Sequence, residues 1–212
     1  ENVENNRHIL LTTGATITEP FLSVVEIKEM STEEGAELLL HCISDKKDFV
    51  STERIMAKVI ALQLGGLPLA IKQAGAYIRE TECSLTGYLQ RYRTYLFNRK
   101  RIFSFSAKEH NYFHIVATTW MLSFEKIASE QQAVANILRL CTFLHPDKIP
   151  EEILVKGAKE LGDVLAPVAA NPVELEMALN FISKYSLLYY NPNTNILTIH
   201  RLGQTILIEE MD

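Results

Sequence analysis

The sequence predicts a mainly α-helical protein: four helices, then a second helical unit that ends in a β-hairpin, with two short strands ahead of both. Three observations support this order. Apolar residues recur at helical spacing through residues 31–98. Glycine and proline residues interrupt that spacing where one helix must end and the next begin. Near the C-terminus, two β-like runs flank the segment Asn-Pro-Asn-Thr-Asn, which is typical of a hairpin turn.

The two short strands come first. His8–Thr13 and Val24–Ile27 are short runs rich in isoleucine, leucine and valine, as buried strands of parallel sheets are. Two such strands do not form a stable sheet alone. We therefore expect residues 1–29 to be the terminal strands of an α/β domain whose earlier strands precede them. The first residue is Glu1 and not methionine, which also suggests a piece of a longer protein.

Residues 30–98 are predicted to form one compact bundle of four helices. Ser31 and Glu34 have the spacing of a capping box, in which the side chain of each residue accepts a hydrogen bond from the backbone N–H of the other. Pro68 suits the first position of a helix, where its missing N–H would be unpaired in any case. The four helices are expected to begin near Ser31, Thr52, Pro68 and Ser84.

A polar connector at residues 99–111 leads to the second unit, residues 112–212. Its β-like runs are Leu187–Tyr190 and Ile196–His200. Helices followed by such a hairpin are the order of a winged-helix domain, a relative of helix-turn-helix folds. The helices of this unit are expected to begin near Phe113, Glu130, Pro150, Pro172 and Leu202.

Charge and composition exclude several classes of protein. The 212 residues include 21 Lys and Arg against 26 Asp and Glu, and the net charge of -5 argues against nucleic-acid or anionic-membrane partners. No apolar run approaches the roughly 20 residues of a membrane-spanning helix, and the polar start ENVENNR is unlike a signal peptide. The three cysteines fit reduced thiols and not a disulfide or zinc framework. We expect a cytoplasmic protein without a metal site.

Five segments resemble, in the same order, motifs of the NB-ARC proteins, which belong to the STAND class of signalling ATPases. Leu64–Ala70 (LGGLPLA) closely resembles the family's GLPLA motif, which joins two helices of its ARC-type helical domain. Arg7–Thr13 looks like the strand that reads the γ-phosphate, and Val25–Ser31 like the link into the helical domain. Cys141–Pro150 is similar to a winged-helix segment, and Ile199–Gln204 matches the place of the MHD motif.

The resemblance implies an ADP/ATP-dependent switch. In such proteins ADP is buried between a P-loop domain, the helical domain and the winged helix, and exchange for ATP frees the winged helix to rotate. Mapped by motif, Pro68 would pack on the adenine and His200 would donate a hydrogen bond to the β-phosphate of ADP. The nucleotide-binding residues that the resemblance implies are Thr12, Thr13, Gly66, Leu67, Pro68 and His200.

The resemblance also implies partners and cofactors. The partners are a P-loop domain earlier in the same chain, a TPR-like repeat domain after it, and further copies in a nucleotide-dependent homo-oligomer. ADP or ATP with Mg²⁺ would belong to the whole protein, and residues 1–212 alone are expected to retain neither. The same positions have plainer interpretations: Pro68 fits a proline that merely starts a helix, and His200 an ordinary histidine at a strand end.

The chain departs from the family pattern at three points. Gly14 stands where the family has an arginine that reads a phosphate with its bidentate fork. Arg201 replaces the aspartate of the MHD motif, and no Walker A sequence is present. Gly157–Asp163 has the two-glycine spacing, but Asp163 occupies the position that needs lysine. Because phosphoryl transfer needs a phosphate cradle and a metal, the chain alone is not expected to be an enzyme. Slow ATP hydrolysis stays open for the whole protein.

Two other functions stay open from the sequence. A winged-helix DNA-binding regulator would need a basic recognition helix before its wing. The candidate helix, Pro172–Tyr185, instead carries Glu174 and Glu176 and one lysine, Lys184, which disfavours phosphate contacts. A nucleotide-independent interaction scaffold is compatible with the departures from the family pattern.

Overall fold

The computed structural model describes residues 25, 27–44, 48–99 and 110–211, and all structural statements refer to these. Ten α-helices and one three-stranded antiparallel sheet confirm the mainly helical fold. The predicted strand His8–Thr13 lies outside the described residues, and so do Gly14 and most of Val24–Ile27. Val25 and Ile27 are described as exposed and outside any strand.

Four helices form the N-terminal bundle, close to where local sequence chemistry predicts them. The capping box at the first helix is present: the Ser31 N–H donates to Glu34 Oε2 over 2.8 Å, and the Glu34 N–H donates to Ser31 Oγ over 3.2 Å. Buried apolar side chains such as Leu39, Ile60 and Ile71 fill the space between the first three helices. The bundle consists of α1 (Thr32–Ile43), α2 (Ser51–Gln63), α3 (Pro68–Thr81) and α4 (Leu85–Arg99).

The C-terminal elements have winged-helix topology: a helix, a strand, further helices and a β-hairpin. The sheet order is β1-β3-β2, with Leu188 opposite Ile199 in the hairpin and Ile149 opposite Leu197 across the other pair. The elements are α5 (His110–Glu130), α6 (Gln132–Cys141), β1 (Ile149–Pro150), α7 (Glu152–Gly157), η1 (Ala158–Glu160), α8 (Gly162–Ala170), α9 (Pro172–Lys184), β2 (Leu188–Asn191), β3 (Ile196–Ile199) and α10 (Arg201–Met211).

The prediction that Pro150 starts a helix was wrong. Ile149–Pro150 is instead the edge strand β1, and the helix α7 begins two residues later, at Glu152. Proline is tolerated at a sheet edge because its missing N–H leaves no ladder bond unmade. Ile149 is buried, and the N–H of Glu151 continues the contact by donating to Asn195 O over 2.9 Å. Pairing with a strand about fifty residues away therefore overrides the local helix-start pattern.

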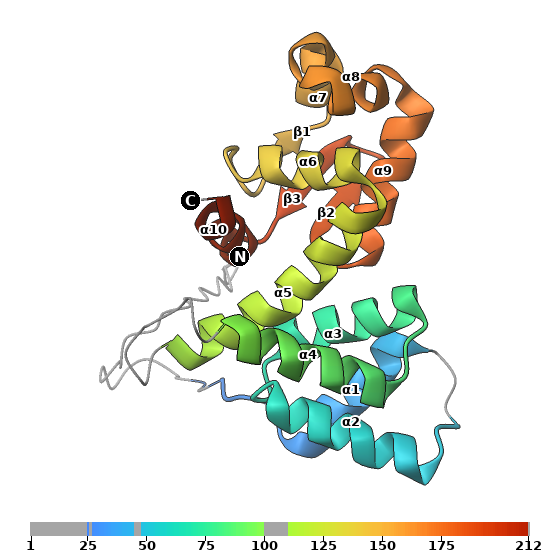
Figure 1. Cartoon of the computed structure of the whole chain (residues 1–212), viewed down its shortest axis with the longest axis vertical. Helices are drawn as coiled ribbons and strands as arrows, with labels where there is room; N and C mark the ends of the chain where they lie inside the picture. The colour runs from blue at the N-terminus through green and yellow to red at the C-terminus, as the bar shows by residue number, and fades with distance from the viewer. Residues whose placement is uncertain (1–24, 26, 45–47, 100–109, 212) are drawn as a thin grey trace, which may run out of the picture.

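Helix α5 is the element that both halves of the protein share. Figure 1 shows it running obliquely from the four helices of the bundle to the C-terminal elements. It packs against α3 and α4 on one side and against α6 and α10 on the other. Trp120, in the middle of α5, is 1% exposed and stacks on Phe124 with 5.9 Å between ring centroids. The division into domains predicted from the sequence stays a prediction.

Candidate functional site

The loop between α2 and α3 contains Gly66, Leu67 and Pro68, three of the residues assigned to nucleotide binding. Gly65 and Gly66 turn the chain with positive φ angles of 62° and 64°. Gly66 is buried, and a Cβ atom added to it would lie 2.2 Å from the carbonyl oxygen of Met30. The N–H of Met30 also donates to Gly66 O over 3.0 Å. The hydrogen bond and close contact between Met30 and Gly66 therefore hold the segment before α1 against this loop.

Pro68 is the first residue of α3, as predicted, and its side chain is exposed. Leu67 precedes it as the N-cap residue and provides no capping hydrogen bond from its side chain. The first N–H groups of a helix have no partner within the helix and attract anions when no side chain caps them. The start of α3 thus presents an apolar ring beside backbone N–H groups on the surface of the bundle.

His200 links the strand β3 to the helix α10 and is exposed. Its Nδ1 atom accepts a hydrogen bond from the N–H of Leu202 over 3.2 Å, so the imidazole caps α10. In a neutral imidazole one nitrogen accepts and the other carries the proton. The proton of His200 is therefore on Nε2, which is left as a donor. His200 can therefore cap α10 through Nδ1 and still donate a hydrogen bond to a ligand through Nε2.

The departure from the MHD motif at Arg201 has a local explanation. The Arg201 guanidinium pairs with Asp147 over 2.9 Å, and the hydroxyl of Thr198 donates to Asp147 O over 3.3 Å. Arg201 thus has an acidic partner in the loop after α6. Both charged side chains are well exposed, so we expect the pair to contribute at most about 1 kcal/mol.

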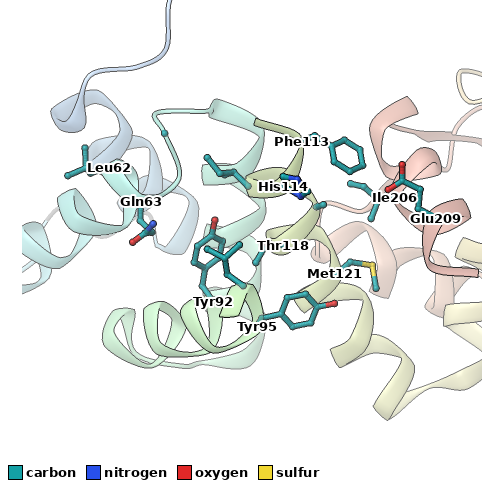
Figure 2. A pocket seen from close by; sticks show the side chains of 14 residues that line it. Leu62, Gln63, Tyr92, Tyr95, Phe113, His114, Thr118, Met121, Ile206 and Glu209 are labelled. Carbon is teal, nitrogen blue, oxygen red and sulfur yellow. The ribbon is translucent and has the colours of Figure 1, made fainter. Parts of the chain in front are cut away.

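Of the residues assigned from the sequence that the structure describes, Gly66, Leu67 and Pro68 are consecutive at the start of α3, and His200 directly precedes another helix, α10. Neither Pro68 nor His200 lines the cavity between α2, α4, α5 and α10 (Figure 2) or the cavity between α6, α8 and α9. Their two helices, α3 and α10, both pack on α5. Thr12 and Thr13 lie outside the described residues.

A contact that sequence reasoning missed joins the bundle to the winged-helix elements. Arg79, near the end of α3, donates from Nη1 to Cys42 O over 3.1 Å and from Nη2 to Lys184 O over 3.0 Å. Cys42 lies at the end of α1 and Lys184 at the end of α9, where carbonyl groups lack helical partners and carry the negative end of the helix dipole. One guanidinium therefore bridges two helix ends from different parts of the protein.

The helix α9, in the position of a recognition helix, carries Glu174 and Glu176 on exposed positions. The same helix exposes Val173 and Met177, at 66% and 67%. An acidic and apolar surface disfavours contact with a phosphate backbone. Within the described ranges, no group of three His, Cys, Asp or Glu residues is arranged to hold a metal ion. No described helix is both long and apolar enough to cross a membrane.

Two comparisons with known proteins find similarities to this chain. Residues 122–212 match a family described as a domain of unknown function, DUF7779. The chain is 25% identical over 190 residues to a nucleotide-binding leucine-rich repeat (NLR)-like protein of Hyaloscypha variabilis, which covers 86% of this chain and 18% of that protein. The chain thus spans less than a fifth of that relative's length. This similarity is distant, and it relates most of the chain to a region of that NLR-like protein.

Proposed function

We propose that this chain is the regulatory distal part of an ADP/ATP-dependent STAND signalling switch of NB-ARC type. It closes over a nucleotide held by a P-loop domain earlier in the same protein and relays the nucleotide state through movement of the winged helix. His200 carries this proposal, because its cap on α10 leaves Nε2–H free to donate to a phosphate. The start of α3, with exposed Pro68, would supply the wall for the base.

We propose that the P-loop domain binds the phosphates and that this chain only completes the pocket. Without a Walker A lysine and phosphate cradle, the chain contributes two walls of the pocket and no catalytic group. A repeat domain after the winged helix, TPR-like in our prediction, and a nucleotide-dependent homo-oligomer belong to the same proposal. The similar Hyaloscypha protein is named for leucine-rich repeats.

ADP that binds only the folded protein raises its free energy of unfolding, and this increase tests the proposal. A protein that carries this chain behind its P-loop domain should gain about 3 kcal/mol of unfolding free energy at an ADP concentration one hundred times its Kd. Residues 1–212 alone should gain none. Thermal melts of both proteins with and without ADP measure the difference. Stabilisation of residues 1–212 by micromolar ADP would show that the division of labour is wrong.

We expect the Arg79 bridge to help hold the winged-helix elements against the bundle. Arg79→Ala removes both bonds to Cys42 O and Lys184 O, and we expect a cost of about 1–2 kcal/mol because the side chain is partly exposed. Amide hydrogen exchange at the end of α9 should become about tenfold faster. The control is Arg54→Ala, which removes a solvent-exposed ion pair with Glu37 between α2 and α1. Equal exchange at α9 in both variants would contradict the bridge.

A further inference from the structure

Helix α9 lies at the outer edge of the C-terminal elements, on the side opposite α10 (Figure 1). Its side chains Val173 and Met177 lie about one turn apart and are 66% and 67% exposed. Beside them is a cavity of about 430 Å³ between α6, α8 and α9, and Met177, Ala178 and Phe181 line it. An exposed apolar surface that continues into a cavity indicates contact with another protein segment.

The two ends of this surface carry opposite charges. Glu174 lies in the first turn of α9 and Lys184 in the last, and both are exposed and line the cavity. Glu174 Oε1 accepts a hydrogen bond from Asn171 Nδ2 over 3.1 Å, and a carboxylate can accept further bonds beside it. Because residues four or seven positions apart lie on the same side of a helix, one stripe joins the apolar residues to the lysine. The stripe consists of Val173, Met177, Phe181 and Lys184.

The surface of α9 is complementary to itself. If two copies of α9 lie antiparallel about a two-fold axis at the level of Leu179, Glu174 of each copy is level with Lys184 of the other, because both are five residues from the axis. The same axis places Met177 level with Phe181 of the second copy, because each is two residues from it. A thioether beside an aromatic ring is a favourable contact. A single register therefore satisfies the charged pair and the apolar pair together.

We propose that a second copy of this chain binds to this surface, with the two α9 helices antiparallel and an ion pair between Glu174 and Lys184 at each end of the contact. Met177 of each copy enters the cavity of the other and lies against Phe181 there. The pair forms without nucleotide, because none of the residues assigned to ADP lies on α9. It is therefore distinct from the nucleotide-dependent homo-oligomer of the proposed switch.

The dimer is expected to be weak. Two helices of 13 residues bury less than the roughly 1,200 Å² at the lower end of stable interfaces. We expect a Kd on the order of 100 µM for residues 1–212 at low salt. Sedimentation equilibrium over about 10 µM to 1 mM protein covers this range. High salt should weaken the dimer, because it screens exposed ion pairs.

Two charge reversals test the register of the pair. Glu174→Lys and Lys184→Glu each give a dimer with two like-charged pairs, so each variant alone should associate at least about tenfold more weakly than the unmodified chain. An equimolar mixture of the two variants can form a mixed dimer in which both pairs again have opposite charges. The Kd of this mixed dimer should lie within about threefold of that of the unmodified chain.

Two further variants separate this contact from general effects of charge. Glu176→Lys makes the same change of charge as Glu174→Lys on the same helix, but Glu176 lies about 100° around the helix from Met177 and outside the contact. It should associate as the unmodified chain does. Met177→Asp replaces an exposed apolar side chain, so it should keep the fold and associate at least about tenfold more weakly. Thermal melts show whether each variant is folded.

Each of four results would overturn the proposal. They are an unmodified chain that stays monomeric up to about 1 mM, no recovery of association in the mixture of the two charge reversals, equal weakening by Glu176→Lys and Glu174→Lys, and undiminished association of Met177→Asp. The third result would mean that net charge and not the register controls association, and the fourth that another surface joins the copies. ADP is absent from all these measurements, so failure here is separate from failure of the nucleotide switch.

Discussion

Gly66→Ala is expected to lower the free energy of unfolding by about 3 kcal/mol or more. Two costs add. A residue other than glycine at a φ of 64° costs about 1–2 kcal/mol. The new Cβ would also lie 2.2 Å from Met30 O, and because that atom belongs to the backbone, no side-chain rotation relieves the contact. Urea denaturation followed by circular dichroism measures the loss.

Gly162→Ala separates these two costs. Gly162 has a φ of 71°, but a Cβ added to it would meet no atom within 4 Å. Only the conformational cost applies there, so we expect a loss of about 1–2 kcal/mol. Equal losses in the two variants would mean that the contact between Gly66 and Met30 does not hold the segment before α1.

Gly203→Leu is expected to separate α10 from α5 and to cost about 2–4 kcal/mol. A Cβ at Gly203 would lie 2.9 Å from Nε1 of Trp120. The indole ring cannot retreat, because it is 1% exposed and stacked on Phe124. Trp120 is the chain's one tryptophan, so its fluorescence reports directly on the contact, and the emission should shift to longer wavelength as water reaches the ring.

The control for this variant is Gly157→Leu, since a Cβ at Gly157 meets nothing within 4 Å. Its fluorescence spectrum should match that of the unmodified chain. An unchanged Trp120 emission in Gly203→Leu would contradict the close packing of α10 on α5. Because α10 begins directly after His200, such a result would also remove the support that this packing gives to the position of His200.

Local chemistry made the helix starts of the bundle predictable. The capping box at Ser31 and the first-turn proline at Pro68 each act within one turn of helix, so their effect can be read from neighbouring residues. The strand β1 could not be found in this way. Its two residues, Ile149–Pro150, become a strand only because Leu197 and its neighbours lie beside them in the fold.

In the candidate site, too, local sequence indicated some residues, while the contacts between distant segments could not be predicted. The resemblance of Leu64–Ala70 to a family motif singled out Pro68, and nothing in those residues revealed that Gly66 binds the backbone of Met30. The Arg79 bridge joins residues 105 positions apart, and the only local indication was a basic side chain in the last turn of α3. The cavity between α2, α4, α5 and α10 likewise depends on four helices meeting, which no single segment of the sequence indicates.

The most direct test of the nucleotide pocket is the ADP affinity of His200→Asp in a protein that carries this chain behind its P-loop domain. Aspartate is a good N-cap and should keep α10 folded, but its negative charge would repel the β-phosphate. We predict at least about a tenfold weaker affinity for ADP with unchanged thermal stability in the absence of nucleotide. His145→Ala, at an exposed loop histidine, should bind ADP normally. Unchanged ADP affinity in His200→Asp would contradict the account.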